Sequence, residues 1–191
     1  MWMLDNKTIS TRFRQCYAEA LNSLDPSTQN GAILVNPDQY MIGHGWNHFP
    51  AGVNEAHWHG EKDAKYARVV HAEVAALLSA ARTGHATKGS TLYCPWAACA
   101  NCAKHIADAG VATLIRHTSS NAAGVTGGHW VQDCVIGDEI MLEAGIRIFE
   151  ASPAMWLMPL RRNGEEWIWS DNDSNPALTL ITEAGQNFER T

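Results

Sequence analysis

The order of secondary-structure patterns in the middle of the chain constrains its fold more than any other feature. Four segments alternate between helical and extended patterns, and they cover residues 69–81, 91–94, 102–109 and 111–115. The first has apolar residues at three- and four-residue steps, as an amphipathic helix does. Because strands that alternate with helices pair in parallel through right-handed crossovers, this region predicts an α/β layer.

The flanking patterns extend this layer on both sides. They predict a helix over 8–24, a hairpin of 31–35 and 40–43, loops over 45–63 and 119–128, a helix over 134–144 and a strand over 146–149. We expect residues 1–150 to form one domain. Residues 151–191, with Trp156, Trp167 and Trp169, are interpreted as a C-terminal extension of unknown role, either an anchored tail or a subunit-contact element.

Composition excludes several classes of protein. Hydrophobic residues make up 46% and charged residues 18% of the chain, which is typical of a globular protein. The net charge of -6 has the wrong sign for holding a nucleic-acid backbone along a basic surface. No apolar run approaches the ~18 residues of a membrane span and no signal-peptide pattern occurs, so we expect a cytoplasmic protein without a membrane partner.

Three potential metal ligands flank the predicted strand at 91–94. His71 lies on the helix before it, and Cys99 and Cys102 form a Cys-x-x-Cys motif that opens the helix after it. Five cysteines without a secretory pattern indicate thiols or metal ligands rather than a disulfide framework. Two thiolates and one imidazole would hold a zinc ion with its fourth position open to water, as in catalytic sites.

Glu73 follows His71 by two residues, so it would project beside the metal without binding it. A carboxylate there can accept a proton from the water at the open position and pass it to a nitrogen of the substrate. Zinc deaminases use this combination of one histidine, two cysteines and a glutamate that is not a ligand. Glu73 is therefore the candidate catalytic residue.

The same residues allow simpler interpretations. A His-x-Glu pair on a helix is often solvated surface, and a Cys-x-x-Cys motif can serve redox chemistry. A purely structural zinc site would need a fourth ligand, for which His105 is the candidate. Cys94 and Cys134 are expected to pack as small apolar residues.

Five ordered blocks resemble the deoxycytidylate deaminase branch of the zinc-dependent cytidine deaminase superfamily, over residues 8–150. The blocks are 23–29 with 31–32, 45–53, 65–73, 91–93, and 99–106 with 109–111. The second block contains a Gly-x-Asn-x-x-Pro-x-Gly pattern, which favours this branch over tRNA adenosine deaminases. The chain departs from the usual family pattern at Trp46, His48, Ala75 and Ala98.

The resemblance implies a three-layer α/β/α sandwich of the cytidine deaminase type with a mixed central sheet. It implies a zinc-dependent deaminase domain at 1–150 that hydrolyses a deoxycytidine nucleotide, most simply dCMP to dUMP and ammonia, in pyrimidine deoxynucleotide metabolism. By the same resemblance, Asn47 would bind the deoxyribose, and the backbone near Ala72 and Pro95 would read the cytosine edge. Relatives form homo-oligomers, often hexamers, and many respond to dCTP and dTTP.

Several alternatives stay open at this stage. A deaminase of another base, a nucleoside or a modified dCMP would share the zinc site, and so would a non-enzymatic zinc-binding module. Spacing does not choose the phosphate-binding cations among Arg12, Arg14, Lys65, Arg68 and Arg116. A second, structural zinc could involve Cys16, His48, His57 and His59, although polar loop side chains are the favoured interpretation.

Overall fold

A six-stranded mixed sheet forms the centre of the computed structural model, which describes residues 5–117, 129–151, 159–162, 164–167 and 178–182. The strands are β1 (Gly31–Val35), β2 (Met41–Trp46), β3 (Thr91–Tyr93), β4 (Thr113–His117), β5 (Arg147–Ala151) and β8 (Leu178–Ile181), in the order β2-β1-β3-β4-β5-β8. A separate hairpin pairs β6 (Leu160–Arg162) with β7 (Glu165–Trp167). The sheet contains both parallel and antiparallel neighbours, which confirms the mixed sheet.

The parallel part of the sheet is the part that alternates with helices. β3 pairs in parallel with β4, and β4 with β5, as the alternation of patterns predicts. β1 pairs antiparallel with both β2 and β3, and the predicted hairpin of β1 and β2 is confirmed. β8, from the C-terminal extension, joins the sheet antiparallel to β5.

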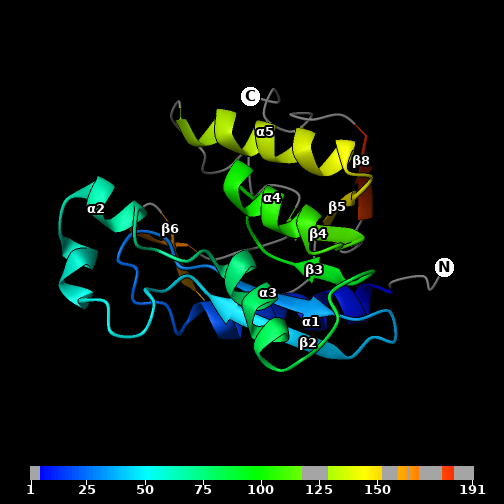
Figure 1. Ribbon diagram of the computed structural model, residues 1–191, viewed down its shortest axis with the longest axis horizontal. Helices are drawn as coiled ribbons and strands as arrows, with labels where there is room; N and C mark the ends of the chain where they lie inside the picture. The colour runs from blue at the N-terminus through cyan, green and yellow to red at the C-terminus, as the bar shows by residue number, and fades with distance from the viewer. Residues whose placement is uncertain (1–4, 118–128, 152–158, 163, 168–177, 183–191) are drawn as a thin grey trace.

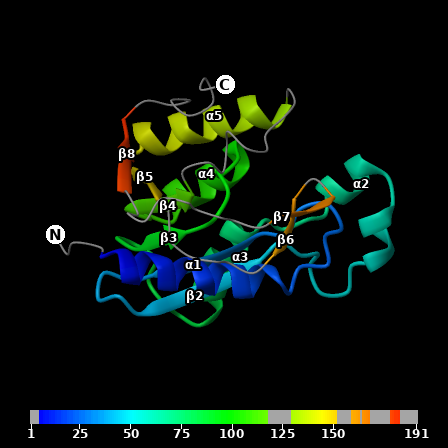
Figure 2. The same ribbon diagram turned by 180° about the vertical axis from the view of Figure 1, so that it is seen from behind.

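Helices cover both faces of the sheet (Figures 1 and 2). α1 (Asn6–Ala20) lies on one face, and α3 (Ala72–Arg82), α4 (Ala100–Asp108) and α5 (His129–Glu143) lie on the other. All five residues of β1 are buried, and they alternate between the two layers. Ile33 packs with Phe13 of α1, whereas Leu34 packs with Ala76 of α3. The three-layer α/β/α sandwich is therefore confirmed.

Several element boundaries differ from the sequence prediction for physical reasons. α1 ends at Ala20 rather than near residue 24, and the Ser23 hydroxyl donates instead to the backbone oxygen of Asn47. β4 and β5 each extend two residues further than predicted. Their ends carry Arg116 and Glu150, which are buried as a hydrogen-bonded pair, so the apolar run does not mark where either strand stops.

The predicted loop over 45–63 contains regular structure. β2 continues to Trp46, η1 spans Glu55–His59, and α2 spans Lys62–Tyr66. Val70, which the helical pattern included, instead forms an isolated β-bridge with His48. The predicted loop at 119–128, together with Trp156 and Trp169, lies outside the described residues.

A close approach between β2 and α3 depends on Gly45. A Cβ atom at Gly45 would lie 2.6 Å from the Cβ of Ala75 and 2.9 Å from its carbonyl carbon. Any larger residue at position 45 would therefore push α3 away from the sheet. Nothing in the structure explains why alanine stands at position 75.

Candidate metal centre

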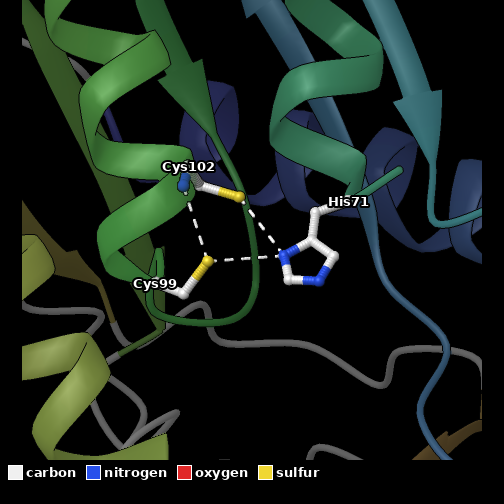
Figure 3. A group of neighbouring side chains, drawn as sticks. All are labelled: His71, Cys99 and Cys102. Carbon is white, nitrogen blue, oxygen red and sulfur yellow. Dashed lines mark hydrogen bonds between the residues drawn. The ribbon is translucent and has the colours of Figure 1, made fainter. Parts of the chain in front are cut away.

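His71, Cys99 and Cys102 converge at the starts of two helices (Figure 3). Their ligand atoms all lie within 4.8 Å of one another. The Nδ1 atom of His71 is 3.5 Å from the Sγ of Cys99 and 3.3 Å from the Sγ of Cys102. One imidazole nitrogen therefore faces both sulfur atoms, which is the arrangement that binding to a common ion requires.

Helix ends place these side chains. His71 caps the N-terminus of α3 and Cys99 caps the N-terminus of α4, both with extended backbones. The backbone N–H of Cys102 donates to the Sγ of Cys99 at 3.5 Å. Because unpaired N–H groups and the helix dipole stabilise negative charge at a helix start, this position favours a thiolate. His71, which the apolar spacing predicts to lie within a helix, is instead the residue before the first turn of α3.

The surroundings of the cluster shift the pKa values of the two thiols in opposite directions. The hydrogen bond from Cys102 is the main cause that lowers the pKa of Cys99, and the hydrogen bond and charge of His71 lower it further. Burial acts in the opposite direction, and the pKa of Cys99 falls to about 4. The hydrogen bond to Cys99 and burial raise the pKa of Cys102 well above its ordinary value. Burial would lower the pKa of His71, but the Cys99 hydrogen bond and the Glu73 charge raise it to about 9. The cluster thus holds a ready thiolate, and a metal ion deprotonates a coordinating thiol.

Glu73 lies in the first turn of α3 and is only 2% exposed. Among the described residues, its Oε2 atom has no hydrogen-bond partner. Burial raises the pKa of Glu73 to about 7, while the His71 charge pulls it in the opposite direction. Because a buried carboxylate oxygen without a partner is costly, this atom is suited to a partner that the chain itself does not supply.

A pocket of about 390 Å³ opens beside the cluster. Its lining residues are Tyr66, Val69, Val70, His71, Val74, Cys99, Asn101, His105, Trp130 and Asp133. Ring contacts join two parts of this lining, because Trp130 lies 5.4 Å from Tyr66 and 6.1 Å from His71 between ring centroids. The volume and the mixed apolar and polar lining are typical of a small-molecule site.

The structure separates His105 from the metal cluster. Its Nδ1 atom lies 2.7 Å from the backbone oxygen of Asn101, one turn earlier in α4. Within the described residues, the metal-binding group consists of His71, Cys99 and Cys102. Among those residues, a closed four-ligand zinc site is not supported, and one position of a tetrahedral ion would face the pocket.

The three residues that the resemblance implies for substrate binding are Asn47, Ala72 and Pro95, and each has a different environment in the structure. Ala72 is fully buried as the first residue of α3, directly after His71. Pro95 accepts a hydrogen bond from the backbone N–H of His117 at 3.4 Å. The amide of Asn47 donates to Asp25 at 3.2 Å and to the backbone of Thr28 at 2.8 Å. Both amide hydrogens of Asn47 are thus engaged inside the protein, and its Oδ1 accepts from the Asn30 N–H.

The candidate phosphate-binding cations are mostly engaged elsewhere. Arg116 is 1% exposed and binds Asp138 and Glu150, so it is a buried structural cation. Lys65 is buried against Asp25, and Arg12 donates to the backbone oxygen of Gln39. Neither lysine nor arginine occurs in the described lining of the pocket. Sequence spacing could not show this, because the partners lie far away along the chain.

Among the described residues, the four side chains considered for a second zinc do not form a group that could hold a metal ion. Cys16 packs between α1 and the sheet, and its thiol donates to the backbone oxygen of Tyr93. His48 contacts the backbone oxygen of Trp46 through its Nδ1 atom. Cys94 is buried as expected, but it also exchanges hydrogen bonds with the Asn30 side chain. Cys134 is also buried, in α5, as expected.

No described helix combines the length and apolar character needed to cross a bilayer.

Comparison with known proteins supports a metal site at these positions. Residues 6–118 match the family described as "Cytidine and deoxycytidylate deaminase zinc-binding region". The chain is 33% identical to the deoxycytidylate deaminase of Mus musculus over 105 residues, which are 52% of this chain and 58% of the mouse protein. It is 29% identical to the deoxycytidylate deaminase of Enterobacteria phage T4 over 156 residues, or 76% of this chain and 74% of the phage protein.

A solved structure shares the fold. The dCMP deaminase of cyanophage S-TIM5 in apo form superposes with a TM-score of 0.59 at 22% identity, covering 75% of this chain and 97% of that protein. The same enzyme in complex with dCMP and dUMP gives a TM-score of 0.51 at 23% identity, covering 78% of this chain and 96% of that protein. Together with the His71, Cys99 and Cys102 group, the matched zinc-binding region identifies zinc as the metal of this protein.

Proposed function

The chain belongs to the family defined by the cytidine and deoxycytidylate deaminase zinc-binding region, and from this premise we propose that it is a zinc-dependent deaminase of deoxycytidine nucleotides. The proposed reaction is the hydrolysis of dCMP: the oxygen of one water molecule is added at C4 of the cytosine, and the amino group leaves as ammonia. The relatives named deoxycytidylate deaminase support this substrate.

One observation carries the proposal. Glu73 is buried beside the metal cluster, and one of its oxygen atoms has no hydrogen-bond partner in the part of the chain that the structure describes. A purely structural zinc site has no use for such a group, which is costly to bury. A hydrolytic site needs it, because a carboxylate at this position can accept a proton from water and return it to the substrate.

The metal ligands in this proposal are Nδ1 of His71 and the sulfur atoms of Cys99 and Cys102. Two soft sulfur donors and one imidazole form a donor set that suits zinc. When bound there, zinc supplies Lewis-acid activation of water. The starts of α3 and α4 hold the three donors in place before any ion binds, since each donor sits at or within one turn of a helix N-terminus.

Glu73 moves the protons in this proposal. Its carboxylate takes one proton from the attacking water and delivers it to N3 of the cytosine. It then takes the second proton, from the hydroxyl group now on C4, and delivers it to the amino group, which leaves as ammonia while the C4 carbonyl forms. A pKa near 7 suits both directions of transfer, and burial is what raises the pKa of Glu73 to that value. The net reaction consumes one water molecule and regenerates the carboxylate.

Contacts to the rest of the nucleotide are also part of the proposal. The backbone next to Ala72 and Pro95 would read the edge of the cytosine ring. Asn47 would meet the deoxyribose through the remaining acceptor position of its Oδ1, because its amide hydrogens already bind Asp25 and Thr28. Assembly into a homo-oligomer and control by dCTP or dTTP are further proposals that rest on the family resemblance.

A second candidate is a deaminase that acts on an unphosphorylated ring compound. It is favoured by the described lining of the pocket, which contains Asp133 but neither lysine nor arginine. A phosphate is usually bound by such cations or by helix-start N–H groups.

Ammonia release separates these candidates. The purified, zinc-loaded protein is assayed with dCMP, deoxycytidine, cytosine and dCTP, and zinc is quantified in the same sample. A kcat/KM highest for dCMP supports the proposal, and one highest for deoxycytidine or cytosine supports the second candidate. Bound zinc without turnover of any of these compounds, or of modified dCMP and tRNA adenosine, would identify a non-enzymatic zinc-binding module.

A further inference from the structure

Helix α2 needs an anchor that its own sequence does not provide. It has only five residues, Lys62–Tyr66, and no side chain caps its N-terminus. Figures 1 and 2 show it at one end of the molecule, apart from the sheet, where it packs mainly against η1. Because isolated helices shorter than ~12 residues are marginal in water, tertiary contacts must hold α2 in place.

Lys65 supplies the strongest of these contacts. Its Nζ atom donates to Oδ1 of Asp25 at 2.7 Å, and only 8% of Lys65 is exposed. The ammonium group also lies 5.7 Å from the ring centroid of Trp58 in η1 and 5.5 Å from that of Tyr66. An ion pair that is withdrawn from water and flanked by aromatic rings has a well-defined geometry, so it can fix the helix that carries it.

Asp25 is itself held firmly by the connection between α1 and β1. Its Oδ1 accepts backbone N–H groups from Ser27 at 2.8 Å and Thr28 at 3.2 Å, and its Oδ2 accepts from the Asn47 amide. Asp25 is 5% exposed. These three donors keep the carboxylate in one orientation, so the ion pair tethers Lys65 to a fixed point between α1 and β1.

The next residue along α2 reaches the pocket. Tyr66 lines the cavity beside the metal cluster and contacts Trp130 of α5 edge-on, with 5.4 Å between ring centroids. Trp130 in turn lies 6.1 Å from the ring of His71. A shift of α2 would therefore move Tyr66 away from Trp130 and open the part of the pocket wall that these two rings form.

We propose that Lys65 is a positioning residue: its buried ion pair with Asp25 anchors α2, so that Tyr66 packs against Trp130 and completes the pocket wall beside the metal cluster. The effect on catalysis rests on the proposed deaminase function. Lys65 acts through Tyr66 and does not touch the reacting atoms. Its loss should therefore weaken substrate binding more than it slows the chemical step.

The test compares Lys65→Met with Lys62→Met, which removes an exposed charge from the same helix. For Lys65→Met we expect faster amide hydrogen exchange over residues 55–66 and unchanged zinc content. The KM for dCMP should rise about tenfold, the size expected if α2 then holds Tyr66 in place only about a tenth of the time. The change in kcat should be smaller. Lys62→Met should match the unmodified protein in all four measurements.

A double-mutant cycle tests the path through Tyr66. Tyr66→Ala removes a side chain that is 36% exposed, so it should fold, and it should raise KM to a similar extent. Adding Lys65→Met to Tyr66→Ala should raise KM little further. Fully additive increases would overturn the proposed path, and so would an unchanged KM in Tyr66→Ala. If Lys65→Met does not fold, the KM of Tyr66→Ala still tests the proposed path, because an unchanged value would overturn it.

Failure of this inference can be told apart from failure of the proposed function. If the unmodified protein does not deaminate dCMP, the proposed function fails, while hydrogen exchange over residues 55–66 still reports on the anchor. If the unmodified protein is active but Lys65→Met leaves both exchange and KM unchanged, the positioning role is wrong. If kcat and zinc content fall together while KM is unchanged, Lys65 has a structural role only.

Discussion

The Nδ1 atom of His71 lies 3.3 Å from the sulfur of Cys102, although the two residues are 31 positions apart in the chain. His71 stands at the start of α3, and Cys102 lies in the first turn of α4. The two residues are far apart in sequence because the chain passes through the rest of α3 and through β3 before it reaches α4. The proximity of these two atoms makes the arrangement a candidate metal site, and the following predictions depend on it.

Glu73→Gln should keep the zinc and lose the activity. The amide has nearly the same shape as the carboxylate but cannot accept the proton, and general acid–base groups contribute about 10²–10⁴-fold to turnover. Zinc content and kcat for dCMP are measured on the same preparation. Glu139→Gln, at an exposed position of α5, serves as the control and should leave both unchanged. Loss of zinc in Glu73→Gln would show that Glu73 is a ligand.

Removal of the metal should abolish turnover reversibly. A chelator takes away the ion that joins α3 to α4, so we expect activity to vanish and the melting temperature to fall, with both restored by added zinc. Cys99→Ser and Cys102→Ser should bind zinc more weakly, whereas Cys134→Ala should keep it. We expect one zinc per chain. Two zinc ions per chain in the chelator-free protein would contradict the positions of Cys16 and His48 in this fold.

Arg116→Met should destabilise the fold without removing zinc. The guanidinium binds Asp138 with two hydrogen bonds, at 2.6 and 2.9 Å, and binds Glu150 at 3.0 Å. Burial alone would lower the pKa of Arg116, but Asp138 and Glu150 raise it, so the cation stays charged throughout the working pH range. Leaving two buried carboxylates without their cation should cost about 3–5 kcal/mol.

Urea unfolding of the zinc-loaded protein measures this loss. Arg147→Met is the matched control, because Arg147 is exposed and its side chain donates only to the Thr113 hydroxyl in the part of the chain that the structure describes. Its effect should stay below about 1 kcal/mol. An equal loss in the two variants would mean that the buried network adds nothing beyond an ordinary surface contact.

Gly137→Ala should disturb the metal site from a neighbouring helix. A Cβ atom there would overlap the backbone oxygen of Ala98 and lie 3.1 Å from the carbonyl carbon of Cys99. Alanine is the better helix former by about 1 kcal/mol, yet the overlap with backbone should outweigh this gain and cost about 1–3 kcal/mol net. Weaker zinc binding is expected as well, because α5 would push on the segment that carries Cys99.

Zinc affinity by competition with a chelator, together with thermal unfolding, checks this prediction. Gly60→Ala is the control, since the nearest atom to its added Cβ would be 3.7 Å away. If Gly137→Ala binds zinc as tightly as the unmodified chain, α5 does not constrain the Cys99 segment.

The thiol of Cys16 should resist alkylation in the folded protein up to about pH 9. Burial raises the pKa of this thiol well above its ordinary value, so the reactive thiolate is scarce until the pH is far higher. Mass spectrometry after iodoacetamide treatment should find Cys16 unmodified in the native chain and modified after unfolding in urea. Modification of native Cys16 at pH 8 would show that α1 opens readily from the sheet.

Much of the site could be predicted because its chemistry lies in short motifs. The spacing of His71 to Glu73 and of Cys99 to Cys102 is local, and the alternation of strands and helices places the two motifs on the helices that flank one strand, although it did not show that His71 stands before the first turn. The spacing of apolar residues along the chain likewise predicts the hairpin of β1 and β2 and the parallel pairing of β3, β4 and β5. Local spacing and periodicity suffice for these features, because neighbouring residues determine them.

The tertiary structure alone decided the partners of the buried charges. Arg116 and Lys65 look alike in the sequence as free cations, but one binds Asp138 and Glu150 and the other binds Asp25, 40 residues away. The amide of Asn47 is likewise engaged by Asp25 and Thr28. A buried charge takes whichever opposite group the folded chain brings within reach of it, since leaving it unpaired away from water costs far more than any local preference.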